Sequence, residues 1–258
     1  MKLRKLLIPP GVVLLFLLSW LFSPTRAYWD FLDHHAFYAL NGWVQESVFW
    51  QNVWAFMGTR SMDGIYDGLM LFSLIYYIKK GKRIDRKRRV AELIFVALLI
   101  FLTLYTVNQI LFSKCLHLCR ASPTITCANP FRLSYVIKWT AVKDQSYTSF
   151  PGDHATTAFL FASIIYHLMG WRAGTLATFY AVIFSLPRLV AGAHWLTDVL
   201  LGSSMIALSV SSLAFGTPIA NCCIHLIQSI FSVFIGKKHQ GRKNLQTKPE
   251  GGGTRGRN

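Results

Sequence analysis

The chain has 258 residues, of which 53% are hydrophobic and only 15% are charged. This balance excludes an intrinsically disordered protein. The net charge of +16 comes from short runs of Lys and Arg between long apolar blocks. Such runs are typical of cytoplasmic loops in membrane proteins, whereas a nucleic-acid-binding face would interleave basic and aromatic residues. We therefore expect a membrane protein that contacts membrane lipids and has no nucleic-acid partner.

The beginning of the chain predicts a membrane anchor followed by helices at the membrane surface. An apolar run at 6–22 follows the basic start MKLRK. The run is longer than the core of a signal peptide, and SPTRA after it lacks a signal-peptidase pattern, so we expect an uncleaved first span. The segment 23–63 is rich in Trp, Phe and Tyr, which is typical of amphipathic helices at the interface.

Further apolar blocks predict a fold that is all-α, a six-transmembrane-helix bundle over residues 1–236. The basic run KKGKRIDRKRR after the second span predicts a cytoplasmic loop, and WRAG predicts a tight cytoplasmic turn. A seventh span at 219–235 would carry the basic end of the chain outside, so we expect a helix on the inner surface there. A disordered cytoplasmic tail is expected at 237–258, which leaves both termini inside. The five later spans are expected at 64–78, 90–112, 155–170, 175–186 and 198–215.

The segment 113–153 has no apolar run long enough to cross a membrane, and loops of such length are usually functional. The six-span topology places it on the outer side together with PRLVAGAHWLTD. Two interpretations stay open for its cysteines: a disulfide between Cys119 and Cys127, or metal binding by Cys115, His117 and Cys119.

Charged side chains near the outer helix ends are costly unless they serve one another or a ligand. Cations, imidazoles and a carboxylate together suit phosphoryl transfer by a histidine nucleophile: the cations neutralise the phosphate oxygens, one imidazole attacks phosphorus, and the other protonates the leaving oxygen. The residues in question are Lys114, Arg120, His154, Arg188, His194 and Asp198.

The spacing of these residues predicts their roles. His194 and Asp198 are four apart, so a helix that begins by Ala193 would let the carboxylate hydrogen-bond to the imidazole of the nucleophile. SFPGDHATT predicts a turn entering a helix, whose free amides near Gly152 and Asp153 bind phosphate. His154 in the first turn is then placed to protonate the leaving group.

Here a resemblance to a known family appears. Arg188-LVAGA-His194-WLT-Asp198 matches the Arg-x5-His-xxx-Asp motif of the type 2 phosphatidic acid phosphatase and vanadium haloperoxidase superfamily. FPGDHA resembles the second motif, usually Pro-Ser-Gly-His, with Gly152 and Asp153 in place of Ser and Gly. The first motif, Lys-x6-Arg-Pro, is matched least well.

In that first motif, Lys114 and Arg120 are separated by five residues and Pro123 is displaced by Ala-Ser. Within the superfamily, RASPT, KDQSYTSFPGDH and PRLVAGAHWLTD, with TRSMDG before the second span, look closest to the bacterial lipid A phosphotransferases. The core motifs then fall within 114–202. Arg60 and Asp63 in TRSMDG either shape the lipid headgroup site or cap a helix.

The resemblance implies a phosphoryl transfer from undecaprenyl diphosphate to lipid A through a phosphohistidine. It places the active site on the periplasmic face of the bacterial inner membrane, with a lipid-linked phosphate substrate entering from the outer leaflet. It implies no cofactor and no metal. Two alternatives are a phosphatase for undecaprenyl diphosphate, phosphatidic acid or phosphatidylglycerophosphate, and a non-enzymatic transporter or membrane scaffold.

Overall fold

A computed structural model describes residues 3–246, and all regular secondary structure in that range is helical, which confirms the all-α prediction. Most elements are α-helices, η1 is a 3₁₀-helix, and η2 and η3 are π-helical. In chain order they are α1 (Leu3–Leu21), α2 (Ser23–Gln45), α3 (Val48–Met57), α4 (Arg60–Lys80), η1 (Arg83–Asp85), α5 (Arg86–Leu102), η2 (Thr103–Cys115), α6 (Pro123–Thr126), α7 (Leu133–Val136), α8 (Asp153–Met169), α9 (Trp171–Val190), η3 (Asp198–Ser203), α10 (Ser204–Gly216) and α11 (Ile219–Gln246).

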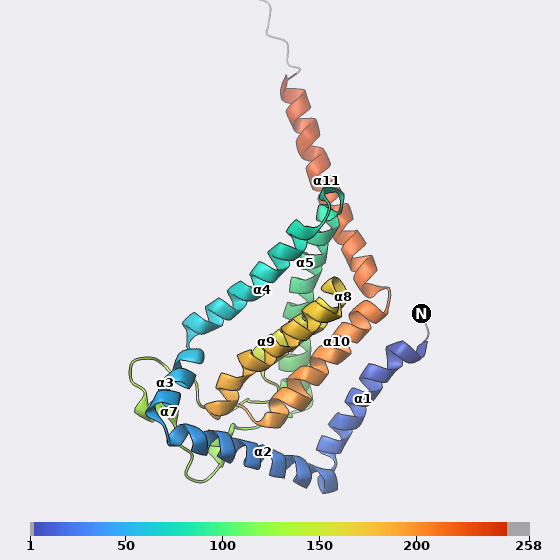
Figure 1. Ribbon diagram of the computed structural model, residues 1–258. Helices are drawn as coiled ribbons and strands as arrows, with labels where there is room; N and C mark the ends of the chain where they lie inside the picture. The colour runs from blue at the N-terminus through green and yellow to red at the C-terminus, as the bar shows by residue number, and fades with distance from the viewer. Residues whose placement is uncertain (1–2, 247–258) are drawn as a thin grey trace, which may run out of the picture.

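The helices α4, α5, α8, α9 and α10 form a bundle, and α2 lies across one end of it (Figure 1). The chain turns by 89° between α1 and α2. Phe22 at this corner is extended, and Pro24 stands in the first turn of α2, where its missing N–H leaves no hydrogen bond unmade. The corner lets α1 pack along the bundle while α2 covers its end, so the expected surface helix is brought over the segments that carry the motifs.

The turn between α8 and α9 is tighter than expected. Gly170 alone separates the two helices, with a φ of 87° that only glycine adopts readily. The predicted turn WRAG is instead the first turn of α9, and this helix continues past the predicted end at residue 186 to Val190. Pro187 falls in its last turn, where Arg188 and Val190 are buried, and this packing carries the helix past the proline.

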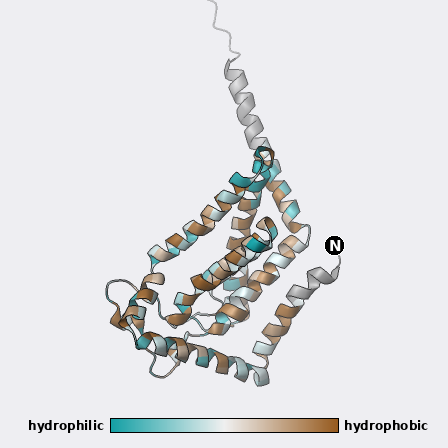
Figure 2. Cartoon of the chain, in the orientation of Figure 1, coloured by the Kyte–Doolittle hydropathy of each residue, from teal (hydrophilic) through white to brown (hydrophobic). Residues whose placement is uncertain are grey.

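In the part of the chain that the structure describes, three helical stretches are long and apolar enough to cross a membrane, and a fourth is added if the bent α1–α2 pair is taken as one span. The three are Arg83–Cys115, Trp171–Val190 and Asp198–Gly216. The six-span count stays a prediction, because α8 has only 17 residues and the first turns of α4 carry Arg60 and Asp63. Hydrophobic colour runs along the bundle helices, while the turn between α4 and α5 is hydrophilic (Figure 2).

The last helix packs against α5 as well as extending away from the bundle. Ala220 and Ile224 of α11 share an apolar cluster with Ala91 and Phe95 of α5. The helix continues to Gln246, into the stretch expected to be a disordered tail, and residues 247–258 lie outside the described part of the chain.

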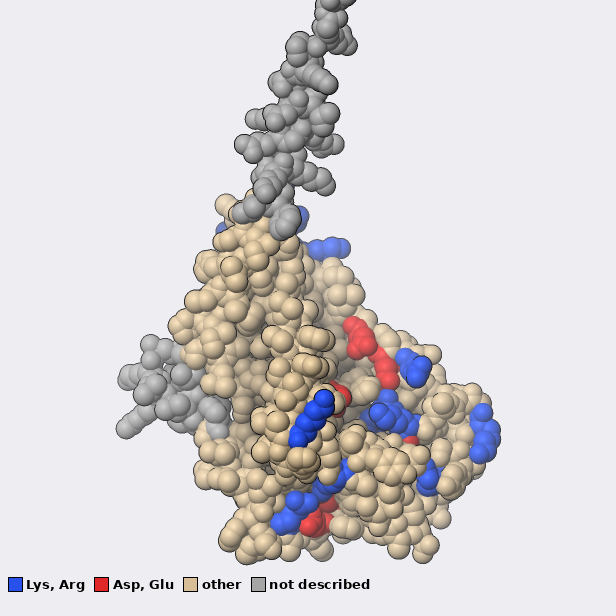
Figure 3. Space-filling view, turned by 180° about the vertical axis from the view of Figure 1, so that it is seen from behind, with Lys and Arg blue, Asp and Glu red and all other residues tan. Residues whose placement is uncertain are grey.

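The bundle has two chemically different ends. The α4 helix begins with Arg60 at the end covered by α2 and finishes with Lys79 and Lys80 at the other. Seen from behind in Figure 3, acidic and basic residues mix over the half near α2, and the surface between them and the basic residues at the opposite end is mostly uncharged. The starts of α8 and η3 and the end of α9 share the α2 end, where the predicted catalytic residues therefore meet.

Candidate active site

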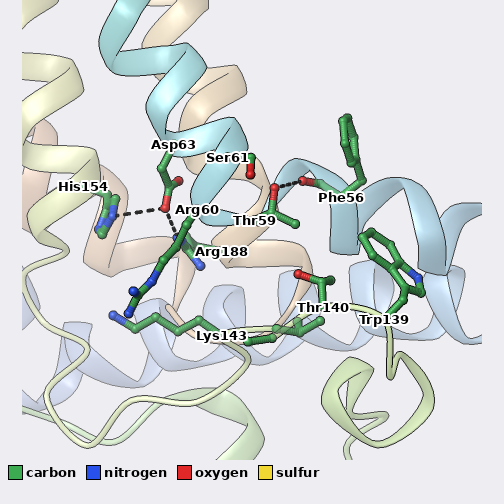
Figure 4. Close-up of a pocket in the computed structure, with 13 residues that line it drawn as sticks. Phe56, Thr59, Arg60, Ser61, Asp63, Trp139, Thr140, Lys143, His154 and Arg188 are labelled. Carbon is green, nitrogen blue, oxygen red and sulfur yellow. Dashed lines mark hydrogen bonds and ion pairs between the residues drawn. The ribbon is translucent and has the colours of Figure 1, made fainter.

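A cavity of about 700 Å³ opens at this end of the bundle. Its lining combines the first turn of α4, the loop 139–143, His154 from the start of α8 and Arg188 from the end of α9 (Figure 4). These segments are distant in the sequence and meet only because α4, α8 and α9 pack side by side through apolar residues such as Tyr66, Phe161 and Phe184. The cavity thus joins residues of two family motifs with residues that precede both.

His194 does not lie on a helix. The chain leaves α9 through a turn in which Gly192 has a φ of 75°, and the next helical residue after His194 is Leu196. Nδ1 of His194 lies 2.7 Å from the carbonyl oxygen of Ser149 and 3.6 Å from Oδ2 of Asp198. The expected hydrogen bond from His194 to Asp198 is therefore replaced by one to a backbone carbonyl, because the helix starts too late to place both side chains on one face.

This contact determines which nitrogen of His194 is available for chemistry. A carbonyl oxygen can only accept a hydrogen bond, so Nδ1 of His194 must carry a proton. The neutral imidazole then has its lone pair on Nε2. The carbonyl of Ser149 thereby performs the orienting task that we had predicted for the carboxylate of Asp198.

Asp198 is completely buried and accepts hydrogen bonds from Arg120 at 2.9 Å and from the backbone N–H of Trp195 at 2.8 Å. A second buried carboxylate, Asp33 of α2, also pairs with Arg120 at 2.9 Å and accepts two bonds from Thr197. One guanidinium therefore bridges two carboxylates and ties α2 to η3. Arg120, which we predicted to bind phosphate, does not line the cavity, and in this structure its nitrogens serve this network.

His154 and Arg188 do share the cavity, and Asp63 lies between them. Its Oδ2 is 2.9 Å from a guanidinium nitrogen of Arg188 and 3.8 Å from Nε2 of His154. Burial lowers the pKa of His154, and the charges of Arg188 and Lys143, and of His194 when it is protonated, lower it further, while the charge of Asp63 raises it. His154 therefore loses its proton more readily than an exposed histidine unless an anion binds beside it.

Arg60 and Lys143 also line this cavity. The sequence analysis did not assign either residue to phosphate binding. Lys114, which is predicted to bind phosphate, is exposed near the end of η2 and is absent from the cavity lining. Arg60 stood in TRSMDG and Lys143 in KDQSYTSFPGDH, so both were within segments that resemble the family. Their position relative to His154 depends on how α4 and the 139–143 loop fold back, which spacing along the chain does not reveal.

The turn before α8 lies directly against His194. A side chain at Gly152 would place its Cβ only 3.3 Å from Cε1 of His194. Gly152 is also the N-cap of α8, so the free amides of the first turn start at this point. Asp153, which follows, is held by the side-chain amides of Asn108 at 2.8 Å and Gln109 at 3.2 Å, and these bonds tie η2 to the start of α8.

All five cysteines are free in the structure, including Cys119 and Cys127. Among the side chains described, those of residues 11–232, no three or more His, Cys, Asp or Glu come together in a way that could hold a metal ion. The apparent metal set around His117 in the loop is thus not assembled, and Cys119 instead contacts Ser113 at 3.0 Å.

Comparison with known proteins identifies the family of the chain. Residues 93–219 match the model of the PAP2 superfamily. The chain is also 31% identical to the lipid A 1-diphosphate synthase of Escherichia coli (strain K12), over 74% of this chain and 78% of that protein. No solved structure matches the chain. The family match and this relative support a lipid phosphatase or phosphotransferase that works in a membrane, and the chain belongs to the PAP2 superfamily.

Proposed function

We propose that this protein moves a phosphoryl group from undecaprenyl diphosphate to lipid A through a phosphohistidine at His194. The observation that carries the proposal is the contact between Nδ1 of His194 and the carbonyl of Ser149, which leaves Nε2 as the nucleophilic nitrogen. The named activity of the Escherichia coli relative supports lipid A as the acceptor.

Other groups near His194 meet the remaining requirements of the reaction: His154 and Arg188 line the cavity, whereas His194 and Gly152 lie against each other outside its lining. Arg188 and the amides at Gly152 neutralise the oxygens of the phosphoryl group that is transferred. His154 lines the same cavity as Arg188, and a positive charge on His194 lowers the pKa of His154. His154 gives its proton to the departing oxygen. The negative charge of the bound phosphate raises the pKa of His154, so that His154 carries this proton before the transfer. We retain Asp198 as the group that stabilises the charge on His194, from 3.6 Å.

Labelled undecaprenyl diphosphate, with the label in its terminal phosphate, tests the proposal when purified protein receives it with and without lipid A. We expect label on lipid A, label on a histidine in quenched samples, and neither product with His194→Ala. Label released only as inorganic phosphate would end the transferase proposal and favour a lipid phosphatase. Unchanged turnover by His194→Ala would reject the nucleophile, and no turnover of any lipid phosphate by the wild type would favour a transporter or scaffold.

We also propose that the site faces the periplasm from the inner membrane, with both termini in the cytoplasm. The support is the separation of the cavity, at the start of α4, from Lys79 and Lys80 at its end. A reporter enzyme that works only outside the cytoplasm should be active when fused after residue 147 and inactive when fused after residue 84. The opposite pattern would invert the topology.

A further inference from the structure

The side chains of Arg60 and Lys143 line the same cavity. In the view of Figure 4 both extend toward the same part of it, with Arg60 coming from the start of α4 and Lys143 from the loop before α8. Both side chains are exposed, and neither makes an ion pair or a hydrogen bond with any side chain described in the range 11–232. Two cations that line one cavity without a carboxylate partner form a place for an anion.

This pair is distinct from the cation beside the catalytic histidine. Arg188 is nearly buried and is already held by Asp63 at 2.9 Å, whereas Arg60 and Lys143 face open space. The two groups are nonetheless neighbours, because Lys143 is near enough to lower the pKa of His154. The cavity therefore has an inner anion position at Arg188 and His154 and an outer one at Arg60 and Lys143.

We propose that Arg60 and Lys143 form a second phosphate subsite, which holds the phosphate that leaves the donor and then the phosphate of the acceptor. This inference rests on the proposed function and adds to it the residues that hold the phosphate not under attack, which belongs first to the lipid diphosphate donor and then to the lipid phosphate acceptor. Transfer between two phosphates needs two anion positions in line, and a cavity of about 700 Å³ has room for both.

The chemistry balances with one subsite for both phosphates. Nε2 of His194 forms a bond to the terminal phosphorus of the donor, and the bridging P–O bond breaks. Its electron pair stays on the phosphate that remains attached to the lipid, where Arg60 and Lys143 neutralise the charge and His154 supplies a proton, which it recovers from the acceptor phosphate in the second half of the reaction. After the first lipid phosphate departs, an oxygen of the acceptor phosphate attacks the same phosphorus from the same subsite. The N–P bond then breaks and returns its electron pair to Nε2.

The nature of the leaving group separates the two anion positions experimentally. A phosphate monoester loses its second proton at a pKa of about 6, so a departing phosphate needs cations more than a proton. A departing alcohol is far more basic and needs the proton of His154. Loss of the outer cations should therefore harm cleavage of a diphosphate more than cleavage of a simple phosphate monoester.

The test compares farnesyl diphosphate with phosphatidic acid as substrates for the full-length enzyme in detergent. For Arg60→Gln and Lys143→Gln, we expect the ratio of kcat/KM for the diphosphate to kcat/KM for the monoester to fall between about ten- and one-hundredfold. Arg60→Lys keeps the charge and should recover part of that ratio. Lys138→Gln is the matched control, since Lys138 is an exposed lysine of the same loop that does not line the cavity.

Equal losses on both substrates would overturn the subsite, because the cations would then serve the phosphoryl group under attack. Wild-type rates on both substrates would overturn it as well. Elution of each variant as the wild-type species in size-exclusion chromatography keeps a folding defect from being counted as either result. A wild type that cleaves both substrates but transfers nothing to lipid A would contradict the proposed function, while a lowered ratio in the variants would still support the subsite.

Discussion

Replacing Arg120 by Met should destabilise the protein as well as inactivate it. The guanidinium of Arg120 is the cation between Asp33 and Asp198, whose side chains are 1% and 0% exposed. Met has a similar length but no charge, so the variant leaves two buried carboxylates facing each other without a partner. If Arg120 served only to bind phosphate, its loss would not destabilise the fold.

The cost follows from the burial of this network. Removing one partner of a buried ion pair costs about 3–5 kcal/mol, since the remaining charge is left without compensation. Arg120 keeps 17% of its side-chain exposure, and water can reach part of the gap, so we expect a value near 3 kcal/mol. For a chain of this size, that corresponds to a loss of about 6–12 °C in the midpoint of thermal unfolding.

The assay is the temperature at which half of the protein is lost from the monodisperse size-exclusion peak after heating in detergent. Lys114→Met serves as the control, because Lys114 is exposed and the structure shows no hydrogen bond or ion pair for its side chain within the described residues. Asp33→Asn combined with Arg120→Met should cost less than the sum of the two changes. A midpoint for Arg120→Met within 2 °C of the wild type, which is below the expected shift, would refute the structural role and restore Arg120 as a phosphate ligand.

Three further outcomes are expected. Gly192→Ala should destabilise the protein by about 2–4 kcal/mol in heating assays, because its Cβ would lie 2.6 Å from a neighbouring methyl. Gly170→Ala is the control: it adds only backbone strain and should cost less. Equal losses of stability in the two variants would contradict this packing. Asp63→Asn removes the charge that raises the pKa of His154, so this pKa should fall. In a pH–rate profile, the alkaline decline of phosphatidic acid hydrolysis should therefore move to lower pH. A shift to higher pH would reject His154 as the group that protonates the leaving oxygen. Gly152→Ala should slow turnover by about three- to one-hundredfold without changing thermal stability, by crowding the nucleophile, and a wild-type rate would show that the nucleophile has space to spare.

Local pattern was sufficient for the class of fold and for the family. Apolar blocks predict helices because a backbone in an apolar environment must satisfy its own hydrogen bonds, and the all-helical fold follows. The motif Arg188-x5-His194-xxx-Asp198 predicted the family, which the comparisons confirm. The roles of these residues in catalysis stay predictions that the variants above address.

Tertiary structure decided which side chains meet. The sequence placed His194 and Asp198 four apart, yet the late start of η3 gives the imidazole to the carbonyl of Ser149 instead. The sequence also could not reveal that Arg120 pairs with Asp33 in a buried network, or that Arg60 lines the cavity. Each of these contacts depends on the packing of helices distant in the chain, and side-chain directions at such meetings are set by crossing geometry and turn length rather than by spacing along the sequence.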